Sequence, residues 1–159
     1  MIRIDIVNDD EAQWAPSEEL CSTWLQSALE LAEHPPADKD YELSLRLVNE
    51  KEIQRLNAEY RGKDSPTNVL SFPSQLPESI VTELQFCHLG DIAICPHVLE
   101  HEATTQAKNR EAHWAHLLIH GFLHLLGYDH EEEEQAAEME KLEIDALKML
   151  GIPNPYLIG

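Results

Sequence analysis

Cysteines, basic residues and long apolar runs are all scarce in this sequence. Three cysteines, Cys21, Cys87 and Cys95, are an odd number without CxxC spacing, which argues against a disulfide framework and predicts reduced thiols without a chemical role. The N-terminal residues lack the apolar core of a signal peptide, and no segment approaches the length of a membrane span. We therefore expect a cytosolic protein with no membrane partner.

Basic residues number 11 against 30 acidic ones, so the formal net charge is −19. This charge argues against binding nucleic acid through many phosphate contacts, because such contacts normally need lysine or arginine. The distribution is uneven, since residues 131–145 hold eight acids and one lysine. Five basic residues lie within eighteen positions: Arg46, Lys51, Arg55, Arg61 and Lys63. That segment is either a local site for an anion or a solvated face.

A length of 159 residues and an apolar fraction of 43% predict one compact domain over residues 1–159. Alternating or short apolar runs predict four strands, at residues 2–8, 41–49, 68–72 and 89–95. Helical periodicity and capping residues predict five helices, at residues 17–33, 50–60, 96–106, 110–126 and 132–150. The predicted fold class is α+β, with one mixed four-stranded sheet packed with about five helices.

Single residues set several of these boundaries. Ser17 and Asn49 are good N-caps for the first two helices, and Gly62 can stop the second. Pro73 closes the third strand, and a loop of about fifteen residues is expected to follow it.

The strongest chemical signal is the segment HGFLHLLGYDH, which places His120, His124 and His130 at offsets of four and six residues. Residues four apart lie on the same face of a helix, so His120 and His124 can bind one ion. Gly127 can end the helix and return the chain, which brings in His130 as a third ligand. Three imidazoles without a thiolate predict one Zn²⁺ per chain with an open coordination position. The alternative is three ordinary histidines of a buried helix.

The same offsets occur in the zincin pattern HExxHxxGxxH, except that Gly121 stands where that pattern has Glu. A protease of that type uses this carboxylate as its general base. The substitution argues against peptide hydrolysis by that route and leaves the metal site intact.

For three further residues near the histidines, the sequence allows both a structural and a functional interpretation. Arg61 either complements the dipole of a helix end or presents its guanidinium to a phosphate. His116, one turn before His120, is either a core histidine or a proton carrier or hydrogen-bond donor beside the metal ligands. Asp129 either orients a ligand imidazole or bonds the backbone of its own turn.

Two aromatic residues, Trp114 and Tyr128, flank the histidine segment. They either stack on a base or fill the core, and the second is the more common use of aromatics beside helices.

Three segments in this order, YRGKDSPTNVLSFP, LGDIAIC and HGFLHLLGYDH, closely resemble the YbeY family of bacterial endoribonucleases. The resemblance covers roughly residues 43–150, and the histidine segment is its most specific part. It implies a metal-dependent, single-strand-specific endoribonuclease that matures ribosomal RNA, notably the 3′ end of the small-subunit 16S rRNA, and acts in ribosome quality control. Cytoplasmic location and partners on the small ribosomal subunit are also implied.

Carried over by position, the resemblance makes His120, His124 and His130 the zinc ligands and assigns catalytic roles to His120 and Arg61. Many members have Asp where this chain has Asn68, so acid chemistry at that position cannot be carried over. Both water and the ribose 2′-OH stay open as the attacking group. Two rival functions are a non-catalytic ribosome-assembly factor with a structural zinc and a zincin-like metallohydrolase.

Overall fold

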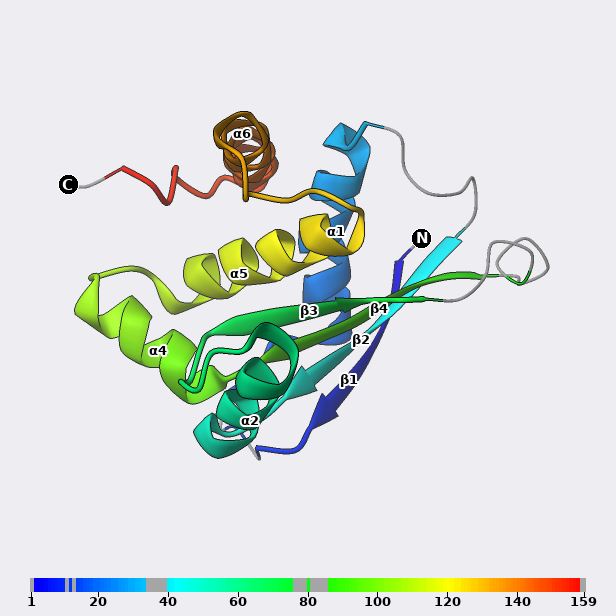
Figure 1. Cartoon of the computed structure of the whole chain (residues 1–159). Helices are drawn as coiled ribbons and strands as arrows, with labels where there is room; N and C mark the ends of the chain where they lie inside the picture. The colour runs from blue at the N-terminus through cyan, green and yellow to red at the C-terminus, as the bar shows by residue number, and fades with distance from the viewer. Residues whose placement is uncertain are drawn as a thin grey trace.

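The computed structural model describes residues 2–10, 12, 14–33, 40–75, 80 and 86–157. Its strands are β1 (Ile2–Asn8), β2 (Asp40–Leu47), β3 (Val69–Pro73) and β4 (Phe86–Ile94). Its helices are α1 (Glu18–Leu31), α2 (Glu50–Arg61), α4 (Pro96–Thr105), α5 (Arg110–Leu125) and α6 (Glu133–Met149). Figure 1 shows how these helices and strands are arranged.

The four strands form one mixed sheet in the order β1-β2-β4-β3. The pairings of β1 with β2 and of β2 with β4 are parallel, whereas β3 runs antiparallel to β4. The predicted α+β class and the mixed four-stranded sheet are therefore confirmed. Strands β1 and β3 are the edges of the sheet. As an edge strand, β3 has one side unpaired within the sheet and can line a cleft at the surface.

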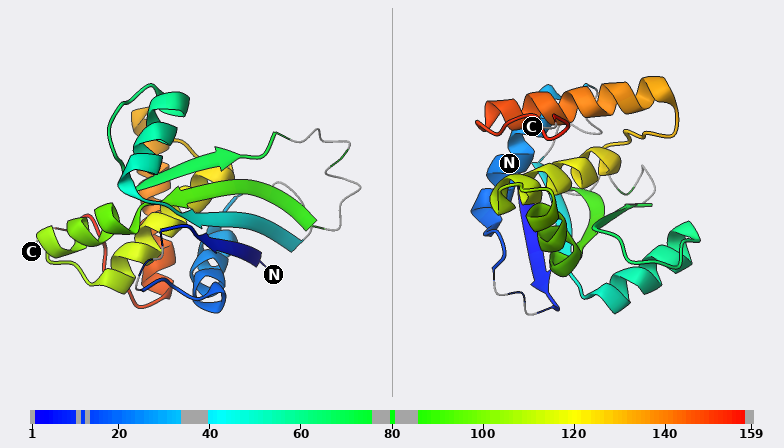
Figure 2. Two further views of the ribbon diagram at one scale, coloured as in Figure 1. Left: turned by 90° about the horizontal axis from the view of Figure 1, so that it is seen from below. Right: turned by 90° about the vertical axis from the view of Figure 1, so that its left-hand side faces the viewer.

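Helices cover both faces of the sheet. Figure 2 (right) shows α6 lying over α5, α5 lying over the sheet, and α2 on the opposite side. The larger apolar core lies between the sheet and α1, α5 and α6, and includes the fully buried Trp114 and Phe122. A smaller core lies under α2 and includes Ile53 and Leu70. Trp114 therefore fills the core and is not available to stack on a base.

The predicted helix caps are confirmed by hydrogen bonds. The Ser17 hydroxyl accepts from the backbone N–H of Leu20, and the Asn49 side chain accepts from that of Glu52. Gly62 ends α2 with a left-handed φ of 71°, which a residue without Cβ adopts at no steric cost. These short-range contacts explain why the starts of α1 and α2 could be predicted from the sequence.

The start of β4 was predicted too late. The strand begins at Phe86, three residues before the predicted start at Leu89. Cys87 and Leu89 alternate inward, and the strand pairs with β2 from Asp40 onward, so tertiary pairing extends it beyond its apolar run. Most of the predicted loop after Pro73 lies outside the described residues.

Candidate metal centre and cleft

The three histidines of the predicted metal site meet at the end of α5. Their nearest ligand nitrogens all lie within 4.8 Å of one another. His120 Nε2 and His124 Nε2 are 3.2 Å apart, and the His130 ring lies 5.6 Å and 5.0 Å from theirs, measured between centroids. The three histidines that the sequence spacing predicted to meet are therefore close together in the structure.

Gly127 makes this meeting possible by ending α5 and reversing the chain. Its φ of 104° lies in the region that favours glycine. Its N–H donates to the His124 carbonyl, and the N–H of Tyr128 donates to the Leu123 carbonyl. This double closure satisfies the last helical carbonyls and carries His130 back towards the helix.

His124 is oriented by the turn itself. Its Nδ1 lies 3.0 Å from the Tyr128 carbonyl oxygen, which can only accept, so Nδ1 carries the proton and Nε2 presents its lone pair. Burial, followed by the nearby His120 and His130, lowers the pKa of His124. Both effects favour the neutral imidazole, which is the form that binds a metal.

His120 is oriented by a carboxylate from another helix, Glu143 of α6. His120 Nδ1 lies 3.0 Å from Glu143 Oε1, so this nitrogen donates and Nε2 is again free to face the other ligands. Figure 1 shows α6 lying over α5.

Glu143 itself is the polar centre of the contact between α5 and α6. It is 1% exposed and also accepts from His116 Nε2 at 3.0 Å and from the Tyr156 hydroxyl at 2.7 Å. Burial alone would raise the pKa of Glu143, but the hydrogen bonds from His116 and His120 outweigh it and lower the pKa to about 2. The carboxylate is therefore ionised and fully engaged at neutral pH.

The geometry of these nitrogens fits a zinc-type ion. Two nitrogens bound to zinc at 2.0–2.1 Å and at the tetrahedral angle lie roughly 3.3 Å apart. The 3.2 Å separation of His120 Nε2 and His124 Nε2 matches this distance. Glu143 and the Tyr128 carbonyl accept the hydrogen bonds that metal-binding imidazoles normally donate through their other ring nitrogen.

Gly121 faces the sheet. A Cβ there would lie 3.1 Å from Ser71 Oγ and 3.3 Å from the side chains of Val69 and Ile92. Ser71 Oγ also donates to the Gly121 carbonyl at 2.9 Å. Even a Cβ at position 121 would make tight contacts with these side chains, so the close packing of α5 on the sheet disfavours the glutamate of the zincin pattern.

A cleft of about 830 Å³ connects the histidines with Arg61. Arg61 is exposed at the end of α2, and no ion pair or hydrogen bond of its side chain is seen within the described part of the chain. Arg55, by contrast, is neutralised by Glu52 and Glu59, and Arg46 pairs with Asp9. Arg61 is therefore the unpaired cation of this cleft among the described residues.

His116 and Asp129 lie close to the three histidines of the metal site. Among the described residues, neither side chain forms a hydrogen bond with the imidazole ring of His120, His124 or His130. His116 reaches His120 only through Glu143. Asp129 Oδ1 accepts from the backbone N–H of His130 at 2.7 Å, which stabilises the turn. Tyr128 lines the cleft, and its hydroxyl exchanges hydrogen bonds with the Glu33 backbone.

The comparisons with known proteins agree with this geometry. A family model described as endoribonuclease YbeY matches residues 5–151. The chain belongs to the YbeY endoribonuclease family. The solution structure of TM1509 from Thermotoga maritima is similar to it, with 29% sequence identity and a TM-score of 0.56. That match covers 95% of this chain and 92% of the other. Membership in the family makes RNA the substrate class and phosphodiester cleavage the reaction class.

Asn68 stands where the YbeY resemblance leads us to expect Asp. Its side chain belongs to a hydrogen-bond network with Glu102 of α4 and His113 of α5. Its Nδ2 donates to both Glu102 oxygens, at 3.0 Å and 3.3 Å. His113, 5% exposed, lies 3.1 Å from Glu102 Oε1. Burial would raise the pKa of Glu102, but the hydrogen bonds from His113 and Asn68 lower it. Asn68 therefore has a structural partner in this member of the family.

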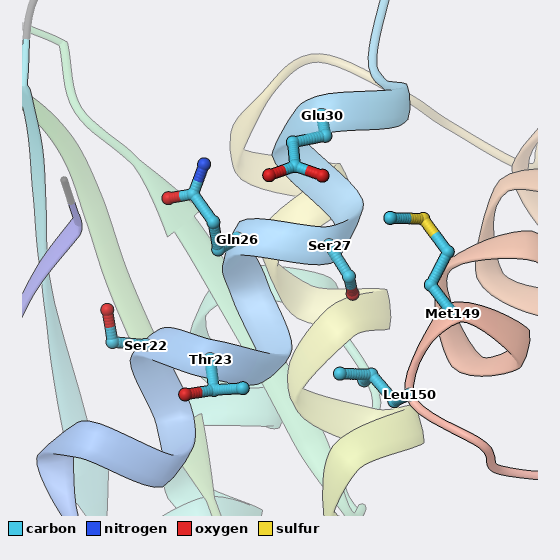
Figure 3. Close-up of a pocket in the computed structure, with 7 residues that line it drawn as sticks. All are labelled: Ser22, Thr23, Gln26, Ser27, Glu30, Met149 and Leu150. Atoms are coloured by element: carbon cyan, nitrogen blue, oxygen red, sulfur yellow. The ribbon is translucent and has the colours of Figure 1, made fainter.

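A second hollow, of about 390 Å³, lies between α1 and the end of α6. Figure 3 shows its lining, in which Glu30 is the one ionisable side chain drawn. It lacks the convergent histidines of the cleft. The cysteines add no further site, since burial raises the pKa of Cys21 to about 12 and also raises that of Cys95. No helix among the described residues is long and apolar enough to cross a membrane.

Proposed function

We propose that this protein is a zinc-dependent, single-strand-specific endoribonuclease acting in ribosomal RNA processing, including maturation of the 16S rRNA 3′ end, and in ribosome quality control. The observation that carries the proposal is the convergence of His120, His124 and His130 in one cleft with Arg61, which has no ion-pair partner among the described residues, in a member of an endoribonuclease family.

His120, His124 and His130 would hold one Zn²⁺, which when bound supplies a Lewis acid for a phosphodiester oxygen. Glu143 keeps Nδ1 of His120 protonated, and the Tyr128 carbonyl does the same for His124, so both Nε2 atoms stay available as ligands.

Arg61 would bind the phosphodiester that is cut. Its guanidinium stays charged near neutral pH and offers two parallel donors to phosphate oxygens. Because the reacting phosphate gains negative charge in the transition state, a cation fixed beside it lowers the barrier. His116 and Asp129 act indirectly, His116 through Glu143 and Asp129 through the turn that carries His130.

The products identify the attacking group. Attack by the ribose 2′-OH leaves a 2′,3′-cyclic phosphate, whereas a 5′-phosphate with a free 3′-OH indicates attack by water. End-labelled single-stranded RNA should be cut, and the same sequence in a duplex should not. Equal cleavage of both forms would contradict single-strand specificity.

Small-subunit ribosomal components are the proposed partners in the cytoplasm. The net charge of −19 predicts that the isolated protein binds naked RNA weakly and with marked salt dependence, so a ribosomal partner would supply specificity. Tight, salt-insensitive binding to naked RNA would contradict this.

The acidic charge also favours a second candidate, a non-catalytic assembly factor in which zinc is structural and acidic α6 contacts basic ribosomal proteins. Cleavage of purified RNA by the purified protein, abolished by a chelator and restored by zinc, would exclude this candidate. A zincin-like metallohydrolase is disfavoured because the chain lacks its glutamate at position 121, where α5 packs tightly on the sheet.

A further inference from the structure

The cleft extends over the edge strand β3 and joins the two faces of the sheet. Val69, Ser71 and Ile92 face α5, because all three would contact a Cβ at Gly121. Leu70 instead packs in the smaller core under α2, as the alternation of a strand requires. Residues from both faces line the same cleft, so a ligand can pass from the histidines over β3 to the end of α2.

Two aromatic rings stand at the α2 end of this cleft. Tyr60 and Phe72 have centroids 5.0 Å apart and an interplanar angle of 69°. Phe72 is half-buried and packs against the smaller core, whereas Tyr60 is 62% exposed. The Tyr60 hydroxyl has no hydrogen-bond partner within the described ranges. Phe72 thus packs against the Tyr60 ring, most of which stays exposed to solvent.

The charged residues near the Tyr60 ring favour a phosphate on one side of it and a base on the other. Arg61 follows Tyr60 directly and lines the same cleft. It has no ion-pair partner in the part of the chain that the structure describes, which suits it to bind a phosphate. Asp91, exposed in the same cleft, is paired with Phe72 across the β-ladder. A carboxylate repels phosphate but can accept an N–H from the edge of a base.

We propose that Tyr60 is a stacking platform for one nucleobase of single-stranded RNA, next to the phosphate bound by Arg61. The proposal rests on the RNA cleavage proposed above and adds a base-binding subsite to it. A base can stack on Tyr60 only when it is unpaired and turned outward, so the subsite would also contribute to single-strand specificity.

Binding of a fluorescent single-stranded oligoribonucleotide to the full-length protein tests the subsite without depending on cleavage. Tyr60→Ala should weaken binding roughly tenfold, because stacking on one aromatic ring is typically worth that much, whereas Tyr60→Phe should stay near wild type. Tyr60→Leu, which is apolar but has no π face, should resemble Tyr60→Ala. Met149→Ala removes another exposed, largely apolar side chain, outside the cleft, and serves as the matched control.

An abasic scan of the same RNA identifies the stacked base. One abasic position should weaken wild-type binding by about the same factor and have no further effect on Tyr60→Ala. In cleavage assays the Tyr60→Ala defect should appear mainly in KM. Additive effects of every abasic position with Tyr60→Ala, or wild-type binding by Tyr60→Ala, would overturn the subsite. In either case, retained cleavage by wild type and its loss in His120→Ala would leave the proposed function standing.

Discussion

Nδ1 of His120 lies 3.0 Å from Oε1 of Glu143, although 23 residues and a change of helix separate the two. The same oxygen accepts from His116, and the other Glu143 oxygen accepts from Tyr156. The carboxylate is thus held by three donors in a buried position. This arrangement makes α6, although strongly acidic on its surface, part of the support for the histidine cluster.

Replacing Glu143 tests that support. Glu143→Gln removes the charge and brings an amide N–H₂ towards the imidazole N–H groups, so we expect zinc affinity to fall by about 10–100-fold. Competition with a chromophoric chelator measures this affinity, and circular dichroism checks that the fold is kept. Glu138→Gln on the exposed side of α6 should have no effect. Unchanged affinity in Glu143→Gln would show that the carboxylate does not act through His120.

Arg61 should matter for cleavage and not for metal binding. Arg61→Glu places a negative charge beside the scissile phosphate, and we expect the cleavage rate to fall by about a hundredfold or more. Zinc content should stay near one per chain. Lys63→Glu makes the same change of charge two residues later, outside the cleft lining, and should have a much smaller effect. Equal losses in both variants would point to overall charge and away from a local contact.

Gly121→Glu tests why the zincin glutamate is absent. The new side chain would meet Ser71, Val69 and Ile92, so we expect the free energy of unfolding to fall by about 3 kcal/mol or more. No peptidase activity should appear. Denaturant unfolding measures the loss, with Ala137→Glu at an exposed position of α6 as the control. A stable Gly121→Glu variant would show that α5 and the sheet separate easily.

Sequence predicted the parts of the site that depend on local geometry. One helical turn and one glycine turn determine how His120, His124 and His130 lie relative to one another. Their convergence can therefore be predicted without knowing the tertiary contacts. Glu143 could not be predicted in the same way, because its contact with His120 depends on how α6 crosses α5. One signal was present, since Glu143 lies on the buried side of α6 with Met139 and Ala146. An acid at such a position needs a partner.

The fold was predictable to a similar extent. Alternation and caps gave the strands and helices, because both are read within a few residues. The extension of β4 back to Phe86 depends on pairing with Asp40 of β2. The parallel and antiparallel choices likewise depend on contacts between distant segments, which periodicity does not encode.

The Glu102 network predicts a specific pH dependence. The pKa of Glu102 lies below its ordinary value of 4.5 in the folded state, so the unfolded chain binds this proton more tightly. The stabilisation is therefore complete above pH 4.5 and is lost as the pH falls through the folded pKa. We expect Glu102→Gln to cost about 1–2 kcal/mol at pH 7, and this difference from wild type to shrink below pH 4.5.

Urea unfolding of both proteins between pH 7 and pH 3 measures that difference. Asp5→Asn, at an exposed position of β1, should show no such trend. A Glu102→Gln deficit that stays constant down to pH 3 would mean that the network does not stabilise the ionised carboxylate.

Zinc content and RNA cleavage, measured on the same preparations of wild type and His120→Ala, test the central claim most directly. Wild type should hold about one zinc per chain and cut single-stranded RNA. His120→Ala should remain folded by circular dichroism, lose most of its zinc and lose cleavage by several orders of magnitude. A folded, zinc-depleted His120→Ala that cuts RNA at the wild-type rate would contradict the account.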